Sequence, residues 1–268
     1  MKTLKGRRPS AGLLAGLLAA LLATPCAAAD EGACFVAGHL VQADYGLPRV
    51  AAAIAAKRLT VAVLGSASST LPGPGGAAKA YPARLEASLM RRLAGVTVKV
   101  IVHAKAREVA SDMVKALKLV LKDERPDVVV WQTGTVDAML GIDPDHFQAA
   151  LGEGIDALHQ GGADTIFVNM QYSPRTDSMI AMGPYVEAIR FVALQRQILL
   201  FDRLAVMNNW NEMGVFDLST ATKKIELAER VHDCIGRLLG RLIVDGANLA
   251  QASNTGAGNV DAPNKDLH

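Results

Sequence analysis

The chain has few aromatic residues, little net charge and no long apolar run beyond its N-terminus. Aromatic residues make up 4% of the 268 residues, and 28 basic side chains nearly balance 26 acidic ones. A nucleic-acid-binding protein would need clustered Lys and Arg on a basic domain, so we expect no nucleic-acid partner. No later stretch stays apolar for about 18 residues, which argues against stable membrane insertion of the mature chain.

Several ligand-binding motifs are also missing. There is no Walker A sequence and no GxGxxG turn, and the glycines at 73–76 alternate with prolines that stiffen their loop. A phosphate cradle needs such a turn directly before a helix. The spacing of His, Cys and Asp matches no metal site. The sequence therefore predicts neither a cofactor nor a metal.

Residues 1–29 have the features of a secretory signal peptide. Lys2, Arg7 and Arg8 precede a Leu/Ala-rich segment at 11–23, and three alanines follow at 27–29. This order of basic, apolar and small residues is typical of cleavable signals. We expect cleavage before Asp30 and a periplasmic or secreted location in a Gram-negative bacterium.

Cysteine is scarce, and its few positions are informative. Of the three cysteines, Cys26 would leave with the signal, so Cys34 and Cys234 remain. In an oxidising compartment two remaining thiols usually pair, which predicts a Cys34–Cys234 disulfide. The alternative is two separate buried thiols.

From residue 59 onward, apolar strand-like runs alternate with helical patterns. The predicted strands cover 59–64, 96–102, 127–131, 165–170 and 198–201. The predicted helices cover 80–93, 107–121, 144–159, 184–195 and 219–244. Strict alternation of this kind favours an α/β fold with a single doubly wound parallel sheet and helices on both faces. We expect this domain at 59–246, after an N-terminal helical arm at 30–58 and before a disordered tail at 247–268.

Polar side chains follow two of the predicted strands. The apolar run 59–64 ends in a turn that contains Ser66 and Ser68, and the run 128–131 ends in a polar segment at 132–137. Right-handed crossovers place all such turns at one edge of a parallel sheet, where α/β folds bind their ligands. The sequence therefore predicts a site at this edge.

Three segments at this edge resemble the conserved blocks of the SGNH (GDSL-type) hydrolases. The turn at 65–69 is similar to the Gly-Asp-Ser turn, 81–85 reads YPARL like the helix start of relatives, and 134–137 looks like Gly-x-Asn-Asp. The resemblance covers about 59–244. It implies a flavodoxin-like, five-stranded sheet and a serine esterase or acyl hydrolase that acts on an ester or acetyl group of a small molecule or envelope component.

The resemblance implies site residues, although this chain departs from the blocks. Ser68 would be the nucleophile, and backbone amides of Ala106 and Gly134 would hold the oxyanion. The Asn of the third block is replaced by Val136. The turn also lacks the Asp of the first block.

The last block would place the triad acid at Asp217 and the base at His232. Asp217 has no His three residues later, and His232 lies within a predicted helix, where a packed or capping histidine is the alternative. His103, directly after the second strand, is a rival base because imidazole titrates near neutral pH.

Other polar residues at this edge could each have either a functional or a structural role. Ser66 and Ser68 could instead cap a helix or bind their own turn, which serines commonly do. Asp137 could orient the serine turn or cap the helix that starts at Pro144. A catalytically inactive protein of the same fold that binds an envelope ligand or partner is therefore the alternative function.

Overall fold

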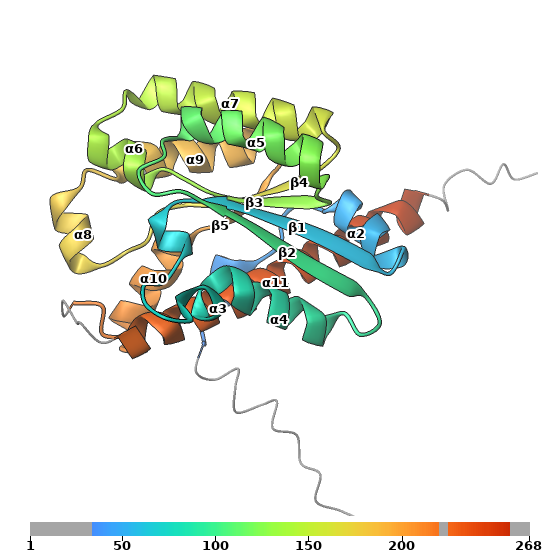
Figure 1. The fold of residues 1–268 in the computed structure, drawn as a ribbon, viewed down its shortest axis with the longest axis horizontal. Coiled ribbons are helices and arrows are strands. Elements are labelled where there is room, and N and C mark those ends of the chain that lie inside the picture. Colours follow the sequence, from blue (N-terminus) through green and yellow to red (C-terminus); the bar gives the residue numbers. More distant parts are fainter. Residues whose placement is uncertain (1–33, 220–224, 258–268) are drawn as a thin grey trace, which may run out of the picture.

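The computed structural model describes residues 34–219 and 225–257, so the expected signal peptide lies outside the described residues. At its centre is a five-stranded, fully parallel sheet with the order β2-β1-β3-β4-β5 (Figure 1). The strands are β1 (Arg58–Gly65), β2 (Thr97–Ala104), β3 (Val128–Gln132), β4 (Asp164–Val168) and β5 (Leu199–Phe201). This order and direction confirm the predicted doubly wound, flavodoxin-like sheet.

Helices cover both faces of the sheet, as the alternation predicts (Figure 1). One face carries α5 (Ala110–Glu124), α6 (Thr135–Leu140), α7 (Pro144–Gln160) and α9 (Gly183–Gln195). The other carries α2 (Pro48–Ala55), α3 (Gly76–Lys79), α4 (Tyr81–Arg92), α10 (Arg203–Glu212) and α11 (Ile225–Ala257). The remaining short elements are η1 (Gly38–Val41), η2 (Ala67–Ser69) and α8 (Pro174–Met179).

Burial explains why the strands are apolar to different degrees. Every residue of β3 is buried, because this strand lies between two neighbours and under helices on both faces. Residues of β2 are only half-buried or exposed, since β2 is an edge strand. Two apolar cores result, one on each side of the sheet. The sheet is therefore a buried platform whose carboxyl ends present the turns.

Close packing of α11 on α4 sets the position of the last helix. A Cβ atom on Gly236 would lie 2.5 Å from Arg84 Cβ and 2.7 Å from the Leu85 backbone nitrogen. Gly240 lies just as close to Ser88, with 2.5 Å between an added Cβ and the serine Oγ. Only glycine lets the two helices approach to this distance.

The predicted disulfide is confirmed. Cys34 and Cys234 are bonded, with 5.2 Å between their Cα atoms and 200 residues between them in sequence. The arm before β1, which we expect to be helical, contains only the short helices η1 and α2, and Pro48 is the first residue of α2. The arm docks on α11, where the Leu47 amide donates to the Gly246 carbonyl at 2.9 Å.

The C-terminal boundary differs from the expectation. We predict a helix at 219–244 and a disordered tail from 247, whereas α11 runs from Ile225 to Ala257. Ala247 and Ala250 are buried, and Gly46 of the arm packs directly on Ala250. The helix therefore continues because the arm covers it; residues 258–268 lie outside the described residues. No helix in the described part of the chain is long and apolar enough to span a membrane.

Candidate active site

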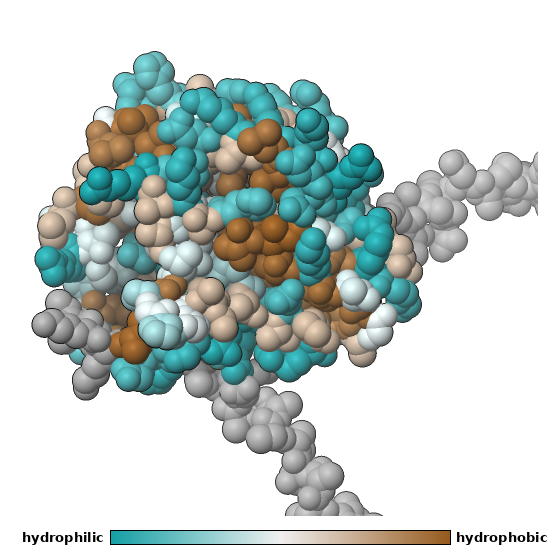
Figure 2. Space-filling model, viewed as in Figure 1, coloured by the Kyte–Doolittle hydropathy of each residue, from teal (hydrophilic) through white to brown (hydrophobic). Residues whose placement is uncertain are grey.

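A cavity of about 860 Å³ opens at the carboxyl edge of the sheet, where the sequence predicts the site. It is lined by Ser66, Ala67, Ser68, Thr70, Leu71, Ala106, Arg107, Thr135, Val136, Met139, Leu140, Gln171, Ala228 and His232. One wall is apolar: Met139 and Leu140 of α6 are each 64% exposed, and Figure 2 shows apolar surface over this helix. Among the described residues that line the cavity, none is acidic.

The serine turn forms the opposite wall. Ser66 follows β1 directly, and η2 then turns Ser68 toward the cavity and Ser69 into the interior. Ser69 fits only because residue 65 is glycine, since a Cβ there would lie 2.1 Å from Ser69 Oγ. The sequence Gly-Ser-Ala-Ser-Ser thus separates one half-exposed hydroxyl, that of Ser68, from a buried one.

Gln132, at the end of β3, connects the serines. Its Nε2 donates to Ser68 Oγ at 2.6 Å and to Ser66 Oγ at 3.2 Å. Its Oε1 accepts from Ser69 Oγ at 2.7 Å and from the Tyr81 hydroxyl at 3.4 Å. The side chain is buried, so this amide fixes the turn from behind.

Arg203, the first residue of α10, lies behind the same wall with only 1% of its surface exposed. Its Nη1 donates to Ser68 Oγ at 3.4 Å and to Gln132 Oε1 at 3.3 Å, and its Nη2 donates to Gln171 Oε1 at 3.3 Å. Its Nε has no partner among the described residues, and no described carboxylate forms an ion pair with it. A buried guanidinium is normally paired with an acid, so this cation is unusual.

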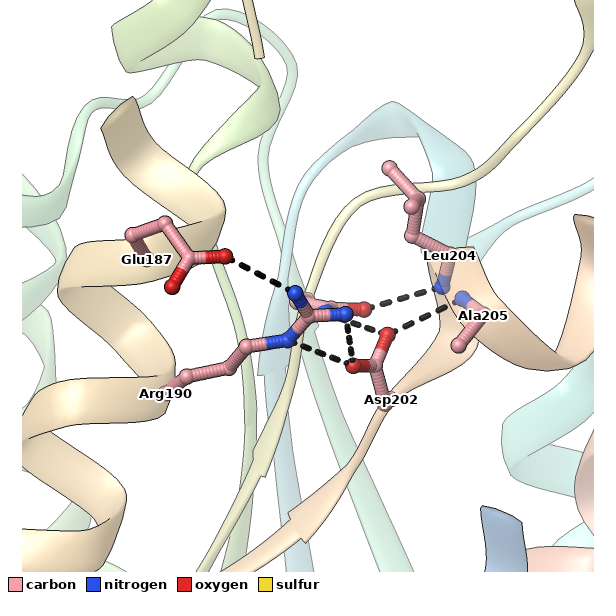
Figure 3. Close-up of polar contacts among 6 residues, drawn as sticks. Glu187, Arg190, Asp202, Leu204 and Ala205 are labelled. Atoms are coloured by element: carbon pink, nitrogen blue, oxygen red, sulfur yellow. Dashed lines mark hydrogen bonds and ion pairs between the residues drawn. The ribbon is translucent and has the colours of Figure 1, made fainter. Parts of the chain in front are cut away.

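Asp202 holds the start of α10 in place and thereby directs Arg203 inward. Its Oδ1 accepts from the Ala205 amide at 2.9 Å, as an N-cap. Arg190 of α9 donates two hydrogen bonds to Asp202 Oδ2, from Nε at 2.9 Å and from Nη2 at 2.6 Å (Figure 3). Asn169, after β4, donates to Asp202 and accepts from the Leu204 amide. Asp202, the residue before Arg203 in the sequence, therefore pairs with Arg190 and not with Arg203.

The electrostatics follow from this burial. Burial lowers the pKa of the Arg203 guanidinium to about 10, while the nearby Tyr81 hydroxyl partly opposes that shift. Arg203 therefore remains a cation at neutral pH. Burial also raises the pKa of Tyr81, with Ser69 and Arg203 opposing the shift, so the phenol stays protonated. The wall that carries Ser68 thus has a positive charge close behind it.

His232 lines the cavity, but its ring is held by α4. Its Nδ1 accepts the Tyr81 backbone N–H at 3.0 Å. A neutral imidazole that accepts at Nδ1 carries its proton on Nε2. Burial and, secondarily, the Arg203 charge lower the pKa of His232 to about 3. His232 is therefore neutral at physiological pH, with a donor rather than an acceptor at Nε2.

The other predicted acid and base groups lie in different surroundings. Asp217 accepts the backbone N–H of Ser219 at 3.0 Å and also its hydroxyl, and the bond that orients His232 comes from Tyr81 instead. His103 is in β2, is absent from the cavity wall, and its buried Nε2 has no partner among the described groups. The structure does not bring either residue to Ser68.

The third block has a structural task. Asp137 is buried and accepts the Ala110 amide at 3.0 Å, so it caps α5. It neither orients the serine turn nor caps the helix at Pro144, whose cap is Asp143. Burial raises the pKa of its carboxyl, opposed by backbone amides that include that of Gly134. Of the two residues expected to hold the oxyanion, Ala106 lines the cavity, and Gly134 is not among its described lining residues. In the described ranges no group of three or more His, Cys, Asp or Glu residues could hold a metal ion.

From the sequence alone, no role was assigned to the two residues that organise this wall, Gln132 and Arg203. Both follow predicted strands, and that position was the available signal. Nothing local distinguishes Arg203 from an exposed arginine, because its burial depends on α10 packing against other elements.

The chain matches a known family over most of its length. The Non-GDSL lipase-like family matches residues 33–249. No curated protein matches the chain. The solved structures give more distant likenesses.

Among these structures, TesA superposes with a TM-score of 0.53 at 20% identity, covering 68% of this chain and 99% of TesA. A putative lipolytic protein of the G-D-S-L family from Desulfitobacterium hafniense DCB-2 superposes with a TM-score of 0.53 at 16% identity. This superposition covers 69% of this chain and 99% of that protein. A variant of Axe2, an acetyl-xylooligosaccharide esterase from Geobacillus Stearmophilus, superposes with a TM-score of 0.53 at 16% sequence identity. The superposition covers 69% of this chain and 94% of Axe2. At these identities the likeness concerns the fold. The match over residues 33–249, by contrast, spans most of the chain and shows that it belongs to the Non-GDSL lipase-like family.

Proposed function

We propose that this chain is an exported member of its hydrolase family that binds an acyl ligand of the cell envelope in the cavity and does not hydrolyse it. One observation carries the proposal: the His232 imidazole accepts the Tyr81 amide at Nδ1. No imidazole nitrogen in the described structure hydrogen-bonds a serine of the turn. Serine is a weak nucleophile unless a base takes its proton.

The tautomer of His232 argues against a catalytic base. To take a proton from Ser68, the ring would need an unprotonated nitrogen on the cavity side. That nitrogen carries the proton in the observed hydrogen-bonding pattern, because the other one faces α4. A pKa of about 3 also makes this imidazole a poor proton acceptor.

The cavity supports the binding half of the proposal. Its walls combine the polar serine turn with apolar residues, among them Leu71, Val136 and Met139. Pockets of this size with few, convergent polar groups are typical small-molecule sites. An acyl group is the ligand that this family suggests. Its carbonyl would fit beside the polar serine turn, and its hydrocarbon chain would fit along the apolar wall.

Export is supported by two features. The segment 1–29 has the order of a cleavable signal. The Cys34–Cys234 bond ties the arm to α11, and such bonds persist in oxidising compartments. The periplasm is therefore the compartment in which we expect the ligand.

Ester hydrolysis by Ser68 is the second candidate, and a specific observation favours it. Ser68 Oγ lies at the cavity wall with the Arg203 cation 3.4 Å away, and a cation there would stabilise an alkoxide. Ser68 Oγ would bond to the carbonyl carbon while its proton passes to solvent, with the oxyanion at the amides of the turn and of Ala106. The alcohol would leave with a proton, and water would then release the acid from the acyl-serine.

Covalent labelling separates the two candidates. The purified protein is incubated with an alkyl fluorophosphonate and with 4-nitrophenyl butyrate, and intact mass and nitrophenol release are followed. We expect no added mass and no turnover above a buffer blank. Labelling that Ser68→Ala abolishes and Ser178→Ala retains would establish the hydrolase instead; Ser178 is an exposed serine of α8.

A further inference from the structure

The groups that face the cavity from its polar wall are hydrogen-bond donors. Gln171 lines the cavity, and its Oε1 accepts from Arg203 Nη2. A guanidinium has only donors, so the amide must turn its oxygen toward Arg203. The Nε2 group of Gln171 is left to point away from the arginine, and no described contact uses it.

The same reasoning applies to Ser68. Its Oγ accepts from Gln132 Nε2 at 2.6 Å and from Arg203 Nη1 at 3.4 Å. Both partners are donors, so the Ser68 hydrogen is not used in either bond. The remaining neighbour, Ser66 Oγ, lies 3.5 Å away, which is too long to hold that hydrogen firmly. Ser68 can therefore donate into the cavity.

His232 supplies a third donor. With Nδ1 occupied by the Tyr81 amide, the proton resides on Nε2 of a ring that lines the cavity. Three donors thus share one cavity whose described lining contains no acidic residue. Such a set is suited to an acceptor-only ligand, that is, an oxyanion.

The charge of the site points to the same ligand. Arg203 is 1% exposed, has no carboxylate partner in the described structure and has an unused Nε. A buried cation without a counter-ion is costly, and a bound anion would offset that cost. Arg107 adds a second, exposed cation to the cavity lining. The apolar wall of α6 on the other side fits a hydrocarbon tail.

We propose that the cavity binds a carboxylate with an apolar tail, whose head accepts hydrogen bonds from Ser68, Gln171 and His232 in front of Arg203. Arg203 acts through Ser68 and Gln171 as a positioning residue, since it is itself covered. The inference rests on the proposed binding function and names its ligand class: the free acid is preferred to the neutral ester. A neutral acyl chain would leave the buried charge uncompensated.

Calorimetric titration with octanoate and with 1-octanol tests the charge preference directly. Both ligands have the same chain, and neither can be hydrolysed, so the result does not depend on turnover. We expect octanoate to bind at least about tenfold more tightly, as charge-assisted hydrogen bonds require. Equal affinities would overturn the inference while leaving the labelling result, and hence the proposed function, unaffected.

A charge-placement variant tests the role of Arg203 without removing a buried residue. Gln171→Glu supplies the missing carboxylate at the same position, 3.3 Å from Arg203 Nη2. We expect it to abolish the octanoate preference and to raise the melting temperature. Gln195→Glu makes the same charge change at an exposed site on α9 and should keep the preference. An octanoate preference that survives Gln171→Glu would show that Arg203 does not create it.

Discussion

The His232 imidazole accepts a hydrogen bond at Nδ1 from the backbone N–H of Tyr81, 3.0 Å away. Tyr81 is the first residue of α4, so this N–H is one of the donors that a helix leaves unsatisfied at its start. Its side chain also reaches Ser69 and Gln132 under the serine turn. One residue thus connects α11, α4 and the cavity wall, and it sets which nitrogen of His232 faces the ligand.

This contact predicts how stability depends on pH. The pKa of His232 is about 3 in the folded chain, well below its ordinary value of 6.5, because burial penalises the charged ring. Below pH 6.5 the unfolded chain binds a proton that the folded chain does not. The His232 contribution to stability is therefore complete above pH 6.5 and is lost as pH falls toward 3, by about 1.4 kcal/mol per pH unit.

Urea unfolding at pH 7, 6, 5 and 4 measures this effect. His232→Gln keeps an acceptor for Tyr81 but does not titrate, so its stability should fall less than that of the unmodified protein. His159→Gln, at an exposed position of α7, should follow the unmodified protein. Parallel curves for all three proteins would contradict the assignment of a neutral His232.

The contribution of Asp164 to stability should change with pH in the opposite direction to that of His232. Burial raises its pKa to about 6, although it accepts the Val50 amide at the start of α2. Between pH 4 and 6 the folded chain holds this proton while the unfolded chain has released it, so the Asp164 contribution falls as pH rises. Asp164→Asn should remove this slope, and Asp156→Asn, at an exposed position, should retain it. An unchanged slope in Asp164→Asn would refute the raised pKa.

Gln132→Met should destabilise the protein by about 2–4 kcal/mol, because it removes one acceptor from the buried Ser69 hydroxyl and one from the buried Arg203 guanidinium. Gln171→Met also removes an acceptor from Arg203, but at a half-buried position that water can reach, so we expect less than half of that cost. Denaturant midpoints with unchanged slopes give both values. Equal costs would mean that Gln132 does not organise the wall.

Gly236→Ala should separate α11 from α4 and cost about 1–3 kcal/mol, since its Cβ would overlap backbone atoms of α4. Gly152, in the middle of α7, has only Arg196 Nη2 within reach of an added Cβ, at 3.9 Å. Gly152→Ala should therefore stabilise the protein by about 0.5–1 kcal/mol through helix propensity. Thermal unfolding of the pair separates close packing from propensity, and a stabilised Gly236→Ala protein would refute the packing argument.

Loss of the disulfide should lower stability by about 2–5 kcal/mol, because the bond closes a loop of 200 residues. The double variant Cys34→Ser, Cys234→Ser and the reduced protein should unfold at the same urea concentration. Cleavage of the arm by protease should also become faster than in the oxidised protein. An unchanged urea midpoint would show that packing alone holds the arm.

Local patterns along the chain were sufficient to predict the sheet, the edge that carries the site and the disulfide. Apolar runs with period and length typical of buried strands predict the parallel sheet, and the turns after them predict the edge at which the cavity opens. The cysteine count, together with the expected signal peptide and oxidising compartment, predicts the Cys34–Cys234 bond. These inferences hold because burial of strands and pairing of thiols impose direct requirements on residue type.

The chemistry of the cavity wall depends on contacts between distant segments, which no local pattern encodes. His232 lies in a helix whose pattern says nothing of Tyr81, 151 residues earlier, yet that amide selects its tautomer. Arg203 is adjacent to Asp202 in sequence, but Arg190 takes that carboxylate and leaves the buried cation to Ser68 and Gln171. Protonation and pairing depend on which groups meet in space and on how little water reaches them, and both follow from packing between distant segments.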